Sequence, residues 1–277
     1  MKLSEAYAYV CSVLPTWAPD GKGSRTANIN YRHCLRILGD VEVEDIDADS
    51  FTQVQQAMLG AGRKHSTTNR VTSALSTILQ TLKKRERLTR AVPHFDLLPE
   101  PKGRITFYTE QEVMEMLSHC HRIDDGQTVQ DCIRFASLTG ARKGEILKLQ
   151  WSDIHWDINE LVFRDTKNKG DDRWIPLSTH LLKLLKEMHE RRIDDGPLFD
   201  IDKDSLLRRL RKLQEFAGIS DKSKCFHTFR HTTATMLFAK GAELPVVMEV
   251  LGHSSAKTTM RYSHATKEGM AKALATL

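Results

Sequence analysis

The segment His227-Thr228-Phe229-Arg230-His231 is followed by Leu251-Gly252-His253 and then by Tyr262, and this ordered set decides the fold of the second half of the chain. His227 and Arg230 are three residues apart in a segment that is predicted to be helical, so both side chains project from one face. An arginine fork matches the non-bridging oxygens of a phosphate, an imidazole can move a proton near neutral pH, and a tyrosine is a latent nucleophile. The set therefore suits chemistry on a phosphodiester.

A second motif, Thr139-Gly140-Ala141-Arg142-Lys143-Gly144-Glu145, would complete a phosphate clamp. Arg142 follows a Thr-Gly break at the start of a predicted helix, where the helix dipole adds to the guanidinium charge. Glu145 stands three residues later, in position to hold Arg142 through a bidentate pair. Each motif alone also fits a surface ion pair, a helix cap or a half-buried core tyrosine. In this order and spacing they indicate one site in which Arg142 and Arg230 flank a single phosphate.

The composition indicates a soluble globular protein: 40% of the 277 residues are hydrophobic and 28% are charged. No apolar run approaches the ~20 residues that cross a bilayer, and the opening residues lack the apolar core of a signal peptide. We therefore expect the protein to stay in the cytosol, or wherever its genome resides. The five cysteines are scattered without metal-ligand spacing, which predicts reduced thiols and no metal site.

The charges are segregated along the first hundred residues. Residues 40–49 carry six acidic side chains and no basic one, whereas residues 60–90 carry eight basic side chains against Glu86 alone. This segregation fits a basic surface that neutralises DNA phosphates. It also fits a solvated helix face, and the charges alone leave both interpretations open.

Proline and glycine punctuation predicts two domains. Residues 1–92 form a helical domain, residues 93–105 an extended linker with three prolines, and residues 106–277 a second domain. In the first domain, helices near residues 27–38 and 66–87 each carry a basic, hydroxyl-bearing face that could enter a major groove. The candidate DNA-binding residues on these faces are Arg25, Arg32, Arg36, Arg70 and Lys84. Faces that merely meet water are the alternative.

The second domain is predicted to be mainly α-helical with a small antiparallel sheet. Thr109 to Glu112 is a capping box, and helices are expected near residues 128–138, 143–150, 179–192, 203–217, 227–240, 245–251, 257–262 and 266–276. Residues 160–166 and 173–177 are predicted to form a hairpin around the turn 167–172.

These motifs, from Thr139 to Glu145, His227 to His231, Leu251 to His253 and at Tyr262, resemble those of the tyrosine recombinases, the phage integrase family. The resemblance covers the whole second domain in motif order, and the helical first domain looks like the core-binding domain of that family. It implies that Arg142 and Arg230 clamp the phosphate, that Tyr262 is the nucleophile, that His227 assists proton transfer and that His253 binds the phosphate.

The resemblance also implies that a lysine in the hairpin turn protonates the leaving 5′ oxygen. Lys167 directly follows the first strand, as the family pattern asks, but the turn is one residue longer than usual and Lys169 remains an alternative.

By the same resemblance, the chain cleaves and rejoins double-stranded DNA at inverted-repeat core sites through a 3′-phosphotyrosine, as a homotetramer and without a cofactor. An accessory DNA-bending protein or a directionality factor is a further expected partner. The first helix begins within the opening residues, so we expect no additional domain for arm-type sites. The helix predicted near residues 266–276 docks either on a neighbouring protomer or on its own domain.

The Thr166-Lys167 pair and the phage-like brevity favour an integrase of a phage or a genomic island. The alternatives are a Xer-like resolvase, a type IB topoisomerase-like enzyme and a DNA-binding regulator that has lost catalysis.

Overall fold

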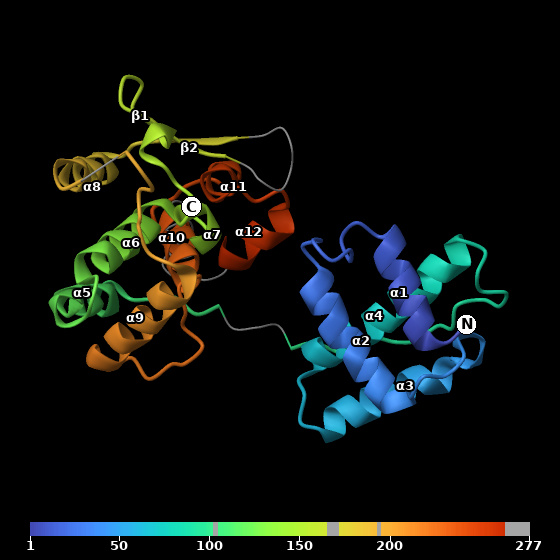
Figure 1. The fold of residues 1–277 in the computed structure, drawn as a ribbon. Coiled ribbons are helices and arrows are strands. Elements are labelled where there is room, and N and C mark those ends of the chain that lie inside the picture. The colour runs from blue at the N-terminus through green and yellow to red at the C-terminus, as the bar shows by residue number, and fades with distance from the viewer. Residues whose placement is uncertain (102–104, 165–171, 193–194, 264–277) are drawn as a thin grey trace, which may run out of the picture. The chain divides into compact units, whose positions relative to one another are not determined.

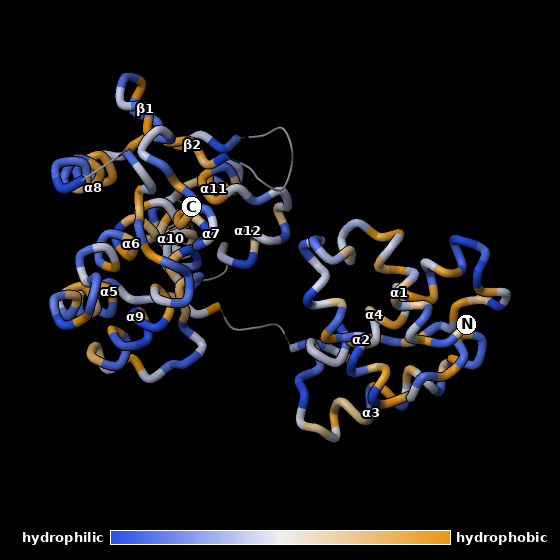
Figure 2. Tube along the Cα trace, in the orientation of Figure 1, coloured by the Kyte–Doolittle hydropathy of each residue, from blue (hydrophilic) through white to orange (hydrophobic). Residues whose placement is uncertain are grey.

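The computed structural model describes residues 1–101, 105–164, 172–192 and 195–263, and the chain divides into two compact units, Met1–Gly103 and Arg104–Leu277 (Figure 1). The predicted fold class is confirmed: the described residues are mainly α-helical, with one small antiparallel sheet. Hydrophobic and hydrophilic residues alternate along the helices of both units, as expected of amphipathic helices (Figure 2). No helix in the described ranges has the length and apolarity of a bilayer-spanning segment.

The first unit is built around one long helix. Its helices are α1 (Leu3–Val13), α2 (Ser24–Leu38), α3 (Ala48–Gly60) and α4 (His65–Lys84), with a 3-10 turn at Val43–Asp45. Helix α4 packs against the other three, because its apolar stripe of Val71, Leu75, Ile78 and Leu82 is completely buried. The opposite stripe of α4 stays polar and exposed.

Part of the predicted linker belongs to the first unit. The Phe95 ring stacks on Phe51 of α3 with ring centroids 4.4 Å apart. The buried Asn69 side chain of α4 donates to the Leu98 carbonyl and accepts from the Leu98 amide, each at 2.9 Å. These contacts extend the packed unit beyond residue 92, where the sequence places its end. The prolines make this segment extended, but its backbone groups still find partners on α3 and α4.

The second unit contains the remaining elements. They are α5 (Glu110–Ser118), a 3-10 turn (Cys120–Arg122), α6 (Gly126–Thr139), α7 (Lys143–Ile146), a 3-10 turn (Trp151–Asp153), β1 (Ile154–His155), β2 (Glu160–Phe163), β3 (Arg173–Pro176), α8 (Thr179–Glu190), α9 (Lys203–Phe216), α10 (Thr228–Ala239), α11 (Leu244–Leu251) and α12 (Ala256–Ser263). The sheet has the order β1-β2-β3 with antiparallel pairing, and Leu161 of β2 lies opposite Ile175 of β3. The predicted hairpin is therefore confirmed, whereas the short strand β1 has no signal in the sequence.

Helix α10 occupies the middle of the second unit and packs against α6, α11 and α12 (Figure 1). A large apolar core spans α5, α6, α8, α9 and the sheet, and Phe229 of α10 belongs to it. A smaller apolar cluster joins Ala234 of α10, Val247 and Leu251 of α11 and Tyr262 of α12. The two clusters meet α10 on different parts of its surface, which fixes the rotation of this helix.

Candidate active site

Helix α10 presents three of the motif side chains on neighbouring positions. His227 is its N-cap residue, and Arg230 and His231 follow in the first turn, at spacings that place all three on one face. The His227 and His231 rings meet edge to face, with centroids 4.8 Å apart. The motif His227 to His231 therefore converges on one spot, as its spacing predicts.

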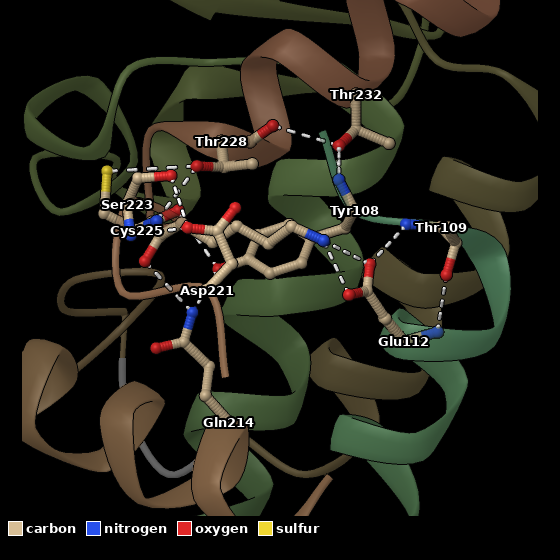
Figure 3. Close-up of polar contacts among 10 residues, drawn as sticks. Tyr108, Thr109, Glu112, Gln214, Asp221, Ser223, Cys225, Thr228 and Thr232 are labelled. Carbon is tan, nitrogen blue, oxygen red and sulfur yellow. Dashed lines mark hydrogen bonds and ion pairs between the residues drawn. The ribbon is translucent and has the colours of Figure 1, made fainter. Parts of the chain in front are cut away.

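A polar network fixes the loop that enters α10 (Figure 3). The buried Tyr108 donates its backbone amide to Thr232 Oγ1 at 2.9 Å and its hydroxyl to the Cys225 carbonyl at 3.3 Å. Gln214 Nε2 donates to the Tyr108 hydroxyl at 2.6 Å, and the Cys225 amide donates to Thr228 Oγ1 at 2.9 Å. Because these bonds hold both the loop and the first turn, they set the position of His227 between Cys225 and Arg230.

Arg230 is a buried cation with an unused donor. Its side chain is 1% exposed, and Nη1 donates to the Gly140 carbonyl at 3.0 Å. Nη2 is buried as well and has no hydrogen-bond partner among the described residues. Burial, reinforced by the charge of Arg142, lowers the pKa of Arg230 to about 10, so the guanidinium stays charged at neutral pH. A buried charged donor without a partner is costly, which points to an anion that binds there.

Arg142 is held by Glu145, but not in the bidentate manner that the sequence suggests. Glu145 Oε1 accepts from Arg142 Nη1 at 2.6 Å, while Oε2 accepts from the Arg142 backbone amide and from Nη2 of Arg173, each at 2.8 Å. Burial would raise the pKa of Glu145, yet the charges of Arg173 and Arg142 hold it below its usual value. One carboxylate therefore positions two arginines.

Helix α7 is a single turn, Lys143–Ile146, where the sequence predicts a helix to residue 150. A helix of one turn sums few peptide dipoles, so the expected dipole contribution at Arg142 is small. The Arg142 side chain is 43% exposed and faces solvent beside its contacts with Glu145. Its own charge, rather than a helix terminus, makes it fit for an anion.

Two glycines in the left-handed conformation complete the arginine cluster. Gly140 ends α6 with φ +62° and supplies the carbonyl for Arg230, and Gly252 ends α11 with φ +65° and accepts from Arg142 Nη2 at 2.8 Å. A Cβ on Gly252 would come within 2.8 Å of Arg173 Nε, and one on Gly140 within 2.6 Å of Leu251. Both positions thus require glycine for conformation and for space.

Tyr262 places its hydroxyl at the polar edge of the small apolar cluster. The residue is 4% exposed, and the hydroxyl lies 2.6 Å from Nδ1 of His231. Burial raises the pKa of the phenol, while the charges of Arg230 and Arg261 pull it down. The His253 ring lies nearly parallel to the Tyr262 ring, at 7° and with centroids 6.4 Å apart, and its Nδ1 lies 2.7 Å from Thr259 Oγ1. The nucleophile expected from the sequence therefore sits beside the histidines and Arg230 in the same chain.

The histidines of the site are neutral at physiological pH. Burial, followed by the charges of Arg230 and Arg142, lowers the pKa of His227 and brings that of His253 to about 4. Neutral imidazoles can either donate or accept a hydrogen bond through each ring nitrogen, depending on the tautomer. The cluster therefore concentrates positive charge on its arginines alone.

Two other expectations lie outside the described residues. Lys167 and Lys169 fall between β2 and β3, in residues 165–171, and the predicted helix near 266–276 falls after residue 263. The strands that flank the lysine turn are described, and Arg173, the first residue of β3, reaches Glu145. The hairpin thus adjoins the arginine cluster at its β3 end.

The candidate DNA-binding residues of the first unit are all exposed. Arg70 lines a groove of about 390 Å³ between α2 and α4, together with Asn30, Ser73 and Thr77. Lys84 lies on the same stripe of α4 as Arg70. Arg25, Arg32 and Arg36 do not line the groove; they follow a different face of α2.

Two residues of the site have no role in the sequence analysis. His231 belongs to the quoted motif, yet a histidine beside a motif arginine carries no signal of its contact with a residue 31 positions later. Arg173 reads as an ordinary strand residue, although its side chain stacks over Phe163 and donates to both Glu145 and the Val250 carbonyl. Only the fold brings these partners together.

Comparison with known proteins shows which family has this arrangement of residues. Residues 106–269, more than half of the chain, match the model of the Phage integrase family. Tyrosine recombinase XerA of Saccharolobus solfataricus is 31% identical over 60% of this chain, and the match spans 55% of that protein. The ICEBs1 integrase of Bacillus subtilis is 27% identical over 88% of this chain and 75% of its own length.

The solved structure of the Tn1549 transposon integrase, in complex with transposon right end DNA, matches the fold. The two chains superpose with a TM-score of 0.81 at 17% identity, over 99% of this chain and 98% of the other. The family model covers each motif that builds the arginine, histidine and tyrosine cluster. This chain belongs to the phage integrase family, the tyrosine-type site-specific recombinases.

Proposed function

We propose that this chain cleaves and rejoins double-stranded DNA through a 3′-phosphotyrosine formed at Tyr262. The observation that carries this proposal is the position of the Tyr262 hydroxyl, which lies in the same buried cluster as Arg230 and its unpartnered Nη2. A phosphodiester that accepts a hydrogen bond from Nη2 would satisfy that donor and would bring its phosphorus toward the phenol. Geometry and charge thus favour attack by this tyrosine.

The charge of the cluster suits the transition state. Arg142, Arg173 and Arg230 contribute three positive charges and Glu145 one negative charge, so these four side chains carry a net charge of +2. A phosphodiester carries one negative charge, and a five-coordinate phosphorus with two equatorial oxyanions carries two. Preorganised cations that match the charge which develops during the reaction lower the barrier. In this proposal Arg142 and Arg230 touch the phosphate and Glu145 positions Arg142. His253 forms a hydrogen bond with a phosphate oxygen, and His227 assists proton transfer.

The reaction is a double exchange of phosphodiester bonds. The Tyr262 oxygen attacks phosphorus, the bond to the 5′ oxygen breaks, and a lysine of the β2–β3 turn protonates that oxygen. We assign this role to Lys167, with Lys169 as the alternative. The 5′ hydroxyl of a partner duplex then attacks the phosphotyrosine, so the bond energy is conserved and no nucleotide or metal cofactor is required. Two such exchanges make and resolve a four-way junction.

We further propose that the first unit binds core-type sites through α4 and the groove beside it. Arg70 and Lys84 supply cations on one stripe, and Ser73 and Thr77 between them supply hydroxyls that can reach phosphates or base edges. Inverted-repeat sites and a homotetramer on DNA follow from the family resemblance. If Arg70 contacts a phosphate, a plot of the logarithm of the binding constant against the logarithm of the salt concentration should be less steep for Arg70→Ala than for the wild type. We expect the slope to decrease in magnitude by about 1.

The biological role that we propose is integration of a phage or a genomic island. The match to the ICEBs1 integrase runs over 88% of this chain, whereas the match to XerA covers 60%. Likeness along both units favours an integrase over a Xer-like resolvase. Sites selected from random DNA by the purified protein would test this role, because an integrase requires two different partner sites and a resolvase acts between identical ones.

A nicked suicide duplex tests the enzymatic proposal. Once the short strand beside the nick diffuses away, the phosphotyrosine cannot be reversed and a covalent protein–DNA adduct accumulates. We expect this adduct from the wild type and none from Tyr262→Phe. A folded wild-type protein that binds the site without an adduct would instead be a regulator. Relaxation of supercoiled DNA that lacks any selected site would indicate a topoisomerase-like enzyme.

A further inference from the structure

The hydroxyl of Tyr262 has one defined hydrogen-bond partner, and this partner has no role in the mechanism proposed so far. Nδ1 of His231 lies 2.6 Å from it, and the two ring centroids are 5.4 Å apart. Among the residues that the structure describes, no other side chain forms a hydrogen bond with this hydroxyl. His253 is the other histidine beside the tyrosine, but its Nδ1 is engaged with Thr259. The contact therefore singles out His231.

The surroundings keep His231 in the form that can accept a proton. The charged and titratable groups around it are His227 and Arg230 on α10, Tyr262 and Arg261 on α12, and His253 beyond α11. Burial, followed by His227, Arg261 and Arg230, lowers the pKa of His231 to about 4. The imidazole is therefore neutral at pH 7, whereas the buried phenol still carries its proton.

DNA binding changes this balance in the required direction. Burial lowers the pKa of His231 most, and the charges of His227, Arg261 and Arg230 lower it further. A phosphodiester beside Arg230 adds a negative charge, which favours an imidazolium and raises the basicity of His231. The histidine thus becomes a better base when the substrate is in place.

We propose that His231 is the proton acceptor for Tyr262 during strand cleavage, an inference that rests on the proposed function. As the bond between the Tyr262 oxygen and phosphorus forms, the phenolic proton moves to Nδ1 of His231. The bond between phosphorus and the 5′ oxygen breaks, and the separate turn lysine protonates that oxygen. In the second exchange the incoming 5′ hydroxyl attacks phosphorus and gives its proton to that lysine, while His231 returns its proton to the departing tyrosine. Proton and electron pairs therefore balance over the cycle.

Two substitutions separate proton uptake from mere positioning. In His231→Asn the amide oxygen can occupy the place of Nδ1 and still accept a hydrogen bond, but it takes up no proton near neutral pH. His231→Ala removes both functions. The readout is single-turnover formation of the covalent adduct on two nicked substrates, one with an ordinary phosphodiester and one with a 5′-bridging sulfur, whose departure needs no proton. The matched control is Lys167→Ala, which removes the proposed acid.

We expect both His231 variants to lose about 10²–10⁴-fold in rate at pH 7, as is typical when a general base is removed. The loss should be equal on both substrates and should shrink as pH rises and solvent deprotonates the phenol. Lys167→Ala should be rescued by the sulfur substrate. Cleavage by His231→Asn at nearly the wild-type rate, or a loss that does not change with pH, would overturn the inference while leaving the adduct-forming wild type intact. No adduct from the wild type would overturn the proposed function itself.

A measurement on the unmodified protein guards against variants that fail to fold. In protein labelled with ¹⁵N-histidine, the shift of Nδ1 of His231 reports whether that nitrogen carries a proton. The inference predicts an unprotonated Nδ1 and a protonated Nε2 at pH 7.5, with Nδ1 in a hydrogen bond that disappears in Tyr262→Phe. A protonated Nδ1 in the wild type would contradict it, because such a nitrogen has no free lone pair for the phenolic proton.

Discussion

Nη2 of Arg142 donates a 2.8 Å hydrogen bond to the carbonyl of Gly252, a residue 110 positions later in the chain. The second clamp arginine repeats this arrangement, since Arg230 donates to the carbonyl of Gly140, 90 positions earlier. Arg230 is thus tied to the left-handed glycine of the motif that carries Arg142. Arg142 is tied to the left-handed glycine that ends α11, and α11 packs against α10. The motifs therefore contribute directly to holding the proposed phosphate clamp together.

Substitution of Gly252 by alanine should disrupt the clamp. The left-handed backbone costs about 1–2 kcal/mol for any residue with a Cβ. The new Cβ would also lie 3.0 Å from Cδ of Arg173 and 2.8 Å from its Nε, so that the Arg173 side chain, which donates to Glu145, must shift. We expect a lower free energy of unfolding in urea and a strongly reduced rate of adduct formation.

Gly218→Ala is the matched control for Gly252→Ala. Gly218 has φ +66°, and a Cβ there would meet no atom within 4 Å. The free energy of unfolding of Gly218→Ala should therefore decrease only by the cost of the left-handed backbone. This variant should cleave DNA at the wild-type rate. Equal cleavage rates for the two variants would mean that the contact with Arg173 does not matter to the clamp.

Glu145→Gln should destabilise the protein and slow cleavage, because it leaves Arg142 and Arg173 without their shared counter-charge. Loss of a charge-assisted hydrogen bond costs about 1.5–3 kcal/mol. The comparison is Glu187→Gln, which removes the partner of Arg134 in a more exposed pair and should cost less than ~1 kcal/mol. Similar unfolding free energies for both variants would show that Glu145 is an ordinary surface acid.

Stability should fall as the pH decreases from about 6.5 toward 4, in addition to ordinary acid unfolding. His231 and His253 have a pKa of about 4 in the folded protein, against 6.5 for an unperturbed histidine. Between these values the unfolded chain binds protons that the folded chain does not, so their contribution is present above pH 6.5 and is lost as the pH falls. The pKa of Glu145 is lowered below 4.5, so the stability that its ionised carboxylate contributes is lost only when the pH falls below 4.5.

Urea unfolding at a series of pH values measures this dependence. His253→Asn should flatten the slope between pH 6.5 and 4, whereas His94→Gln, in which the replaced side chain is exposed in the first unit, should leave it unchanged. A slope that is identical in the wild type and His253→Asn would rule out the burial of a neutral imidazole at this position.

The choice between Lys167 and Lys169 can be made by substitution. Only the lysine that protonates the 5′ oxygen is needed for cleavage of an ordinary phosphodiester and dispensable when sulfur replaces that oxygen. We expect Lys167→Ala to show this pattern and Lys169→Ala to cleave both substrates. The reverse pattern would assign the acid to Lys169, and failure of both variants on the sulfur substrate would exclude either lysine as the acid.

Much of this architecture could be predicted from the sequence, because local signals are strong there. The Thr109 capping box, the helical period of α4 and the hairpin all follow from side-chain patterns that act within a few residues. The motif residues Arg142, Arg230 and Tyr262 could also be chosen, since their order and spacing are informative as a set.

Other features depend on contacts between distant segments, on which the sequence is silent. Strand β1 is two residues long and exists because Ile154 pairs with Leu161. The segment around Leu98 reads as a linker, yet Asn69 binds its backbone. The sharing of Glu145 between two arginines and the contact of His231 with Tyr262 likewise arise only after the chain has folded.

The central claim is that Tyr262 becomes covalently attached to the 3′ end of the cleaved strand. Adduct from the nicked substrate can be digested with nuclease and then with trypsin, which cuts after Arg261 and Lys267 and leaves the modified tyrosine in a six-residue peptide. Mass spectrometry should find this peptide with a nucleotide joined through its 3′ phosphate to Tyr262. A nucleotide on any other residue, or joined through a 5′ phosphate, would contradict the account.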